Sequence, residues 1–109
     1  ERDGQRVTSR LLTEGEWAYC AEKASAAEHV AARLAAKEAA FKALSGSHEA
    51  RAIGWRELEV VHDEHRRPSL VLHGRAAARA EALGVTRTHL TLSHSRQTAG
   101  AVVILERDV

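Results

Sequence analysis

The run AAEHVAARLAAKEAAFKAL, residues 26–44, decides the fold of this chain. It contains no Gly or Pro and is rich in Ala, the residue with the highest helix propensity, so it predicts one long helix. Ser25, followed three residues later by Glu28, forms a capping-box pattern for the helix start, and Ser45-Gly46 suits its end. An approximate helical spacing predicts one apolar stripe made of Val30, Leu34, Phe41 and Leu44.

The segments around this helix predict an α+β fold with a mainly antiparallel sheet. Thr13 and Glu16 form a second capping box, which opens a short helix ending near residue 23. Alternating or apolar patterns predict strands at residues 55–62, 69–73, 88–93 and 100–105, and an Ala-rich helix at 75–83 precedes Gly84. The β-branched run at 101–105 indicates a central strand buried on both faces. Helices and strands in this order are typical of the α+β class.

The composition limits what the chain can be. Its 109 residues, 44% of them hydrophobic, predict a single globular domain over residues 1–109. One cysteine excludes an intrachain disulfide and favours a reducing compartment, so we expect a cytoplasmic protein. No apolar run approaches the length of a membrane span, which argues against a membrane protein. A net charge of +1 and 4% aromatic residues argue against nucleic acid as a partner.

Glu38 and Lys42 form the first candidate site, because residues four apart lie on the same face of a helix. In one interpretation they are a solvated ion pair that contributes about 0.3–0.5 kcal/mol. In the other, Glu38 is a carboxylate ligand of a metal ion, beside lysines that hold phosphate oxygens (Lys37 and Lys42). Mg²⁺ commonly takes one or two carboxylates together with substrate phosphates.

Leu92-Ser93-His94-Ser95, at the end of a predicted strand, is the second candidate. His94 is either a hydrogen-bonded surface residue or a phosphate contact helped by the neighbouring hydroxyl groups. Two further features predict no chemistry. Glu57 and Glu59 alternate along a strand and indicate a polar outer face, and Cys20 has no partner spacing typical of a nucleophile.

Five ordered segments resemble one family: RLLTEGEWAYC, ARLAAKEAAFKAL, IGWRELEVV, RPSLVLHGRAAARAEALGV and HLTLSHS. They resemble holo-acyl-carrier-protein synthase, the small single-domain type of 4'-phosphopantetheinyl transferase. The Lys37-Glu38-Ala39 motif, with Lys42 four residues after the Glu, is the most specific of them. The resemblance runs from about Arg10 to Glu106, with the right order and spacing.

The resemblance implies an enzyme that moves the phosphopantetheine arm of coenzyme A onto a serine of an acyl carrier protein. It implies Mg²⁺ bound by Glu38, and Lys42 as a catalytic, phosphate-contacting residue. It also implies that Arg33, Lys37, His94 and Ser95 contribute to the coenzyme A site. The family works as a homotrimer with its sites between subunits, so Arg33 and His94 are expected across a subunit boundary from the metal.

The resemblance also implies a second metal-binding acid, an Asp in a first strand that this sequence does not contain. Asp3 falls in the segment that follows that strand, so we do not expect it to be this ligand. The strand is then expected upstream of Glu1, in an intact enzyme or in a larger synthase. The alternative is a lineage that has lost it and retains a non-catalytic module for docking carrier protein or for oligomerisation. A nucleotide-binding regulatory domain is a third, weaker possibility.

Overall fold

The computed structural model describes residues 10–108 and confirms the α+β class. Asp3 therefore lies outside the described residues. The elements follow in the order α2 (Glu14–Ala21), α3 (Ala26–Leu44), two 3₁₀ segments (Glu49–Ala52 and Trp55–Glu57), β1 (Leu58–His62), β2 (Pro68–Leu72), α4 (Gly74–Leu83), β3 (Val85–His94) and β4 (Ala99–Arg107). None of the helices within this part of the chain has the length and apolar character to cross a membrane.

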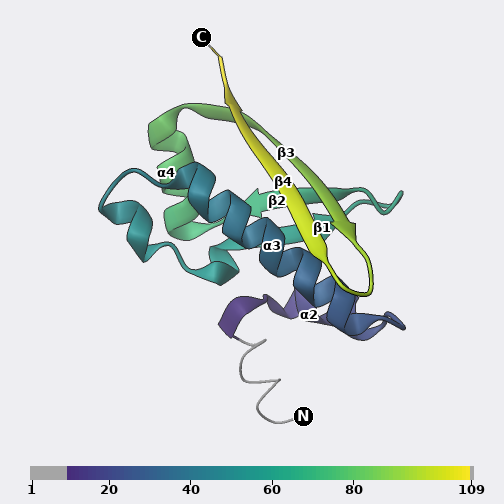
Figure 1. Ribbon diagram of the computed structural model, residues 1–109. Coiled ribbons are helices and arrows are strands. Elements are labelled where there is room, and N and C mark those ends of the chain that lie inside the picture. Colours follow the sequence, from purple (N-terminus) through teal and green to yellow (C-terminus); the bar gives the residue numbers. More distant parts are fainter. Residues whose placement is uncertain (1–9, 109) are drawn as a thin grey trace.

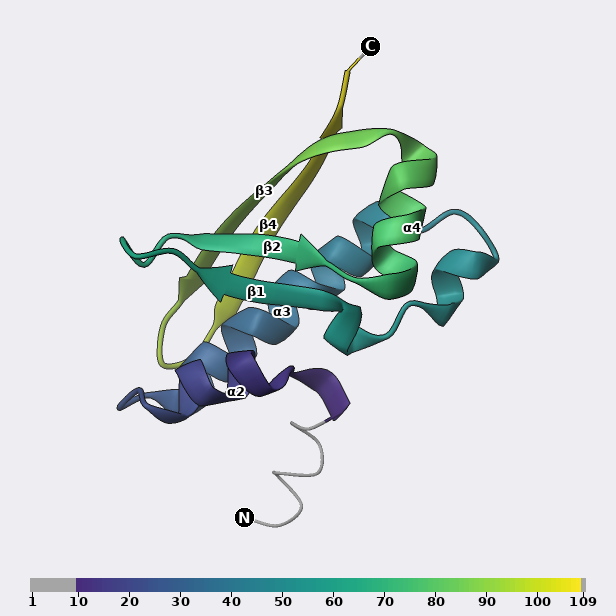
Figure 2. The same ribbon diagram turned by 180° about the vertical axis from the view of Figure 1, so that it is seen from behind.

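The strands form two separate antiparallel hairpins around α3. β1 pairs with β2, with Val60 opposite Leu70, and β3 pairs with β4, with Leu90 opposite Val103. Figure 1 shows α3 in front of the β1–β2 hairpin with β3–β4 running alongside, and Figure 2 shows the same layers from behind. The predicted antiparallel pairing is confirmed, but the strands form two two-stranded sheets.

The apolar core lies between the C-terminal half of α3, the β1–β2 hairpin and α4. Its fully or nearly fully buried members are Ala40, Leu44, Ala50, Ile53, Leu58, Leu70, Ala76 and Ala80. Half of these are alanines, whose small side chains allow the helix backbones to approach closely but add little apolar area each. The core is therefore tightly spaced and contains few large side chains.

The buried face of α3 differs from the predicted apolar stripe. The buried residues are Ala32, Arg33, Ala36, Lys37, Ala40 and Leu44. Of the predicted stripe only Leu44 is buried, and the other three members are half-buried. The stripe prediction was wrong because two long charged side chains find polar partners inside the protein, which hydrophobic periodicity does not detect.

The ends of the helices follow the sequence patterns in part. The Thr13 capping box is confirmed: the Thr13 hydroxyl accepts from the Glu16 amide at 3.1 Å, and the Thr13 amide donates to Glu16 Oε1 at 2.9 Å. Gly84 ends α4 in the left-handed conformation, with φ of 77°. The Ser25 capping box was wrong, because Ser25 makes no side-chain capping hydrogen bond at the start of α3.

Two strand predictions need correction. β4 is not central: Val102 and Ile104 are 58% and 55% exposed, because within residues 10–108 β4 pairs only with β3 and no layer covers its second face. The apolar side chains on this face of the strand are therefore exposed at the surface. The first predicted strand also begins late, at Leu58, since Trp55–Glu57 forms a 3₁₀ turn.

Candidate functional site

Glu38 and Lys42 project from the outer face of α3 into solvent. Lys42 Nζ lies 3.3 Å from Glu38 Oε2, and the two side chains are 73% and 61% exposed. Both groups are free to meet a ligand, because an exposed pair of this kind contributes little to stability. Among residues 10–108 no three His, Cys, Asp or Glu side chains gather into a metal cage, so Glu38 is a single available carboxylate.

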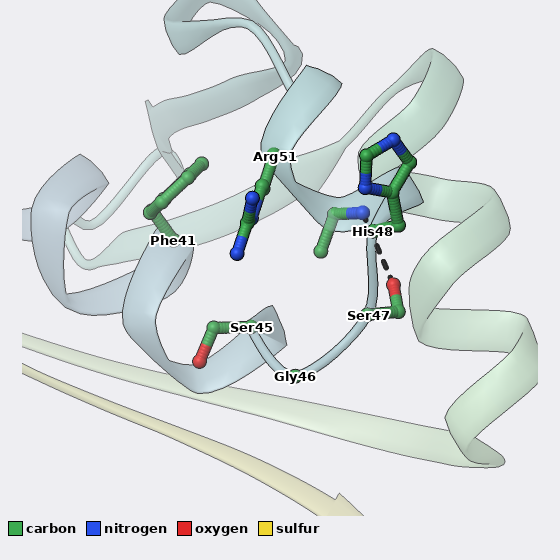
Figure 3. A pocket seen from close by; sticks show the side chains of 7 residues that line it. Phe41, Ser45, Gly46, Ser47, His48 and Arg51 are labelled. Atoms are coloured by element: carbon green, nitrogen blue, oxygen red, sulfur yellow. Dashed lines mark hydrogen bonds between the residues drawn. The ribbon is translucent and has the colours of Figure 1, made fainter.

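A cavity of about 580 Å³ opens at the C-terminal end of α3, and neither Glu38 nor Lys42 lines it. Phe41 and Ser45, which line it, flank Lys42 along the helix, and Arg51 extends between Phe41 and His48 (Figure 3). The loop below is held by the Ser47 hydroxyl, which accepts from the Ala50 amide at 3.1 Å. No sequence pattern predicts this cavity, because a short Ser-Gly-Ser loop is not specific to a binding site.

Lys37 lies inside the protein rather than beside Glu38. Its Nζ donates to Glu16 Oε1 at 2.8 Å and to the carbonyl oxygens of Trp55 and Leu58, each at 2.7 Å. All three ammonium donors are therefore in use and the side chain is fully buried. Burial lowers the pKa of Lys37, while the Glu16 carboxylate opposes that shift. In this structure Lys37 has no donor left for a phosphate.

Arg33 is also buried, under an aromatic cover. Its Nη1 donates to the His29 carbonyl at 2.9 Å, and its Nη2 lies 3.2 Å from His62 Nε2. The guanidinium lies 4.6 Å from the centre of the Tyr19 ring, which stacks on His62 with the ring centres 4.1 Å apart. Arg33 Nε has no hydrogen-bond partner in the part of the chain that the structure describes.

The Arg33 guanidinium affects the ionisation of the two histidines beside it. Burial and the Arg33 guanidinium hold the pKa of His62 below its usual range. The same two causes, together with His94, lower the pKa of His29. A buried cation with one donor left unpaired among the described residues favours an anion as its partner.

His94 and Ser95 lie at the other end of α3. His94 Nδ1 is 3.4 Å from Glu28 Oε1, and its ring meets the His29 ring edge-on at 4.9 Å. The Ser95 hydroxyl accepts from the amides of Gln97 and Thr98, both at 3.3 Å, and so organises the β3–β4 turn. A cavity of about 160 Å³ separates this turn from the first turns of α3.

The predicted site residues therefore fall into separate groups within one chain. Glu28, the partner of His94, precedes Glu38 by ten residues, which corresponds to about 15 Å along a helix, and Lys42 is a further turn away. One chain does not bring the His94 group and the Glu38 group to a common ligand-sized site. Arg33 lies nearer to the His94 group, with which it shares His29.

The prediction that Glu57 and Glu59 form a polar outer face was wrong. Glu57 accepts from the amides of Gly54 and Arg75, and so joins the loop before β1 to the start of α4. Glu59 accepts from the Thr13 hydroxyl and pairs with His73 at 2.8 Å. Both carboxylates hold elements together. Cys20 is buried and free, as expected for a structural cysteine, and burial raises its pKa.

Sequence reasoning missed three residues that shape the site: Glu16, Tyr19 and His62. The capping-box pattern found Glu16, but only as a helix start and not as the partner of Lys37. Tyr19 and His62 lie far apart in the sequence and meet only after folding. No local spacing signal could have found that contact.

Comparison with known proteins defines the class of this fold and site. Residues 1–102 match the family described as the 4'-phosphopantetheinyl transferase superfamily. The chain belongs to this superfamily, which confirms the predicted class of enzyme.

The particular relatives it is similar to are holo-[acyl-carrier-protein] synthases. The protein of that name from Koribacter versatilis is 46% identical, over 97% of this chain and 84% of its own length. The crystal structure of the enzyme from Neisseria meningitidis matches with a TM-score of 0.81 at 26% identity, over 97% of this chain and 84% of that one. A Bacillus anthracis holo-(acyl-carrier-protein) synthase in complex with CoA (3',5'-ADP) matches with a TM-score of 0.74 at 29% identity, over 98% and 85%. The resemblance inferred from the five segments is confirmed.

Proposed function

We propose that this protein transfers 4'-phosphopantetheine from coenzyme A to a serine of an apo acyl carrier protein and releases adenosine 3',5'-bisphosphate. One observation carries the proposal: in a chain of this superfamily, Glu38 and Lys42 stand together on an exposed helix face with no structural task. The names of the relatives, and the CoA complex of the similar Bacillus enzyme, support the donor and the acceptor.

The donors that this chain offers fit a Mg²⁺ ion that is bound mainly by the phosphates of the enzyme's substrate. Glu38 offers one solvent-open carboxylate, and Mg²⁺ is commonly bound by one or two carboxylates, phosphate oxygens and water. When bound, the ion neutralises charge that builds up on the phosphate oxygens during transfer. The second acid expected in a strand before Glu1 stays a prediction.

Lys42 is proposed to hold a phosphate oxygen and to steady the leaving group. Its ammonium is 73% exposed and is tied only to Glu38, so it can turn toward a ligand without breaking the fold. The serine hydroxyl of the carrier protein attacks the phosphorus that bears the pantetheine arm, and the bond to the bisphosphate leaving group breaks. Positioning and charge neutralisation supply most of the catalysis in phosphoryl transfer.

Arg33, His94 and Ser95 are proposed to serve the nucleotide end of coenzyme A. Arg33 provides a buried positive charge whose Nε is unpartnered among the described residues. His94 lies in the same region, beside Glu28. Ser95 shapes the adjoining turn. Lys37 is left out, because its ammonium is satisfied internally.

A homotrimer with sites shared between copies completes the proposal. The open face of β4 presents Val102 and Ile104, an apolar surface that a second copy would cover. Such packing would bring the His94 end of one copy to the Glu38 end of another, which a single chain keeps apart. Residues 1–109 are proposed to act as one domain, and the single cysteine favours a cytoplasmic setting.

Mass spectrometry of an apo acyl carrier protein tests the reaction. After incubation with the full-length protein, coenzyme A and Mg²⁺, we expect the carrier to gain the mass of one phosphopantetheine. A sample treated with a chelator is the control and should show no gain. An unchanged carrier in the presence of Mg²⁺ would contradict the proposed function. If that carrier were still bound, the non-catalytic docking module would be favoured.

A further inference from the structure

The structure joins three parts of the protein through one buried carboxylate. Glu16 Oε1 accepts from the Thr13 amide and from Lys37, and Glu16 Oε2 accepts from the Val60 amide at 2.7 Å. Glu16 belongs to α2, Lys37 to α3 and Val60 to β1. Both charged side chains are fully buried, so the pair acts inside the protein and not at its surface.

Lys37 of this pair also contacts the backbone that leads into β1. Lys37 donates to the carbonyl oxygens of Trp55 and Leu58, which bracket the start of that strand. Each of these bonds has a donor–acceptor distance between 2.7 and 2.8 Å, as expected for charge-assisted hydrogen bonds from an ammonium group. The rotation of α3 at Lys37 is therefore fixed by three acceptors on three other elements: α2, the 3₁₀ segment Trp55–Glu57 and β1.

Lys37 makes three directional hydrogen bonds to other elements, whereas Arg33, which is also buried on this face of α3, contacts the rings of His62 and Tyr19. Ala32, Ala36 and Ala40 are fully buried, but alanine methyl groups are nearly alike in shape and discriminate weakly between helix orientations. A helix that packs through alanines can turn or slide at small cost. A directional ion pair with defined acceptors does not allow this.

The orientation of Lys37 determines where its neighbours point. Successive helix residues are rotated by about 100°, so an inward Lys37 places Glu38 about 100° away and Lys42 about 140° away. Both are then on the solvent side, separated from one another by about 40°. A change in the rotation of α3 would move Glu38 toward the protein or away from the cavity beside Phe41.

We propose that Glu16 and Lys37 are positioning residues that hold α3 in the rotation at which Glu38 and Lys42 meet the substrate and its metal ion. This inference rests on the proposed function. It assigns no contact between either residue and the substrate. It predicts that removing the pair damages metal binding and turnover even in a protein that remains folded.

The double variant Glu16→Met/Lys37→Met tests the proposal, because a buried ion pair can often be replaced by apolar residues of similar size without loss of stability. Calorimetry should show that Mg²⁺ binds the protein–coenzyme A complex about 10-fold more weakly than in the parent. The kcat for transfer should fall about 10- to 100-fold, as expected for a misplaced reacting group. The KM for the carrier protein should stay within about twofold, because the positioned groups act on the reacting phosphate.

The matched control is Arg10→Met/Glu14→Met, which removes one cation and one anion from exposed positions near the same end of the chain. We expect this control to retain the Mg²⁺ affinity and the kcat of the parent. Unchanged Mg²⁺ affinity and kcat in a folded Glu16→Met/Lys37→Met protein, with an active parent, would overturn the inference alone. An inactive parent would overturn the proposed function and the inference with it.

A second variant covers the case in which the apolar pair does not fold. Glu16→Gln/Lys37→Gln removes both charges and keeps polar groups at both positions, and the same loss of metal affinity is expected. If neither double variant folded, the pair would hold the whole fold and not the rotation of one helix. That result would also overturn the proposal.

Discussion

The charged residues toward the two ends of α3 differ in their exposure to solvent. Near the N-terminal end, Arg33 is buried beneath Tyr19 and His62, and His94 from the β3–β4 turn lies close by. Near the C-terminal end, Glu38 and Lys42 stand in solvent. One end holds a cation in a prepared setting, and the other leaves a carboxylate and an ammonium free to bind.

The two groups are spread along the helix. Glu28, the partner of His94, lies about 21 Å along the helix from Lys42, whereas Arg33 lies about 7 Å from Glu38. Between them lies the buried Glu16–Lys37 pair, which we propose fixes the rotation of the helix. Under the proposed function, the His94 group and the Glu38 group of one site come from different copies.

The largest effect is expected at the pair between the two ends. Glu16→Gln leaves the Lys37 ammonium buried beside a neutral amide, and breaking a buried pair in this way costs about 3–5 kcal/mol. Urea unfolding should report this loss. Glu14→Gln, two residues earlier on the exposed side of α2, should change the free energy of unfolding by less than about 0.5 kcal/mol. Equal losses in the free energy of unfolding of the two variants would contradict a specific contribution of the buried pair to stability.

Glu38→Gln should reduce transfer by about 100-fold or more and leave stability unchanged. Gln keeps the size and helix propensity of Glu but loses the charge that Mg²⁺ needs. Rates from carrier mass spectra, with thermal unfolding alongside, separate the two effects. Glu49→Gln, a second exposed carboxylate, serves as the control. Near-parent turnover in Glu38→Gln would remove Glu38 from the metal site.

Lys42→Ala should weaken coenzyme A binding by about 10- to 100-fold, which corresponds to a charge-assisted contact of about 1.5–3 kcal/mol. His94→Ala should cause a smaller loss, and a larger one for coenzyme A than for its analogue without the 3'-phosphate. If Lys42 served only as the partner of Glu38, its removal would cost a few tenths of a kcal/mol of stability and no affinity. Calorimetry with both ligands distinguishes these outcomes.

The smallest expected effect is a pH dependence from the buried end. Burial and Arg33 lower the pKa of His62, and burial and Arg33 also lower that of His29. The unfolded chain then binds more protons than the folded one as the pH falls below about 6.5, so stability declines there. Urea midpoints at pH 7.5 and 5.5 should differ less in His29→Gln/His62→Gln than in the parent. Identical pH dependence would exclude these two histidines as the cause.

Local patterns predicted the helices and strands well, because capping boxes, helix propensity and alternation act over a few residues. The Thr13 box, the extent of α3 and the end of α4 at Gly84 are confirmed on this basis. The exposed Glu38 and Lys42 were also found locally, since residues four apart share a helix face.

The failures share a physical cause, which is dependence on contacts distant in the sequence. Lys37 is predicted to contact phosphate because the acceptors that occupy its ammonium, in Glu16, Trp55 and Leu58, are distant in the sequence. The apolar run of β4 indicates burial, but none of the described residues forms a layer over its outer face. A sequence pattern reports how apolar a strand is, but not what covers it.

Mixing two inactive variants tests most directly the claim that the halves meet between copies. Lys42→Glu and His94→Glu each place a repelling charge in one half-site. They should be unfolded and refolded together in equal amounts. If the site is shared, about one quarter of the sites regain both intact residues, because each residue comes from an unaltered half of the copies. Transfer should then recover to about one quarter of the parent rate, whereas recovery no greater than the mean of the separately refolded variants would contradict the account.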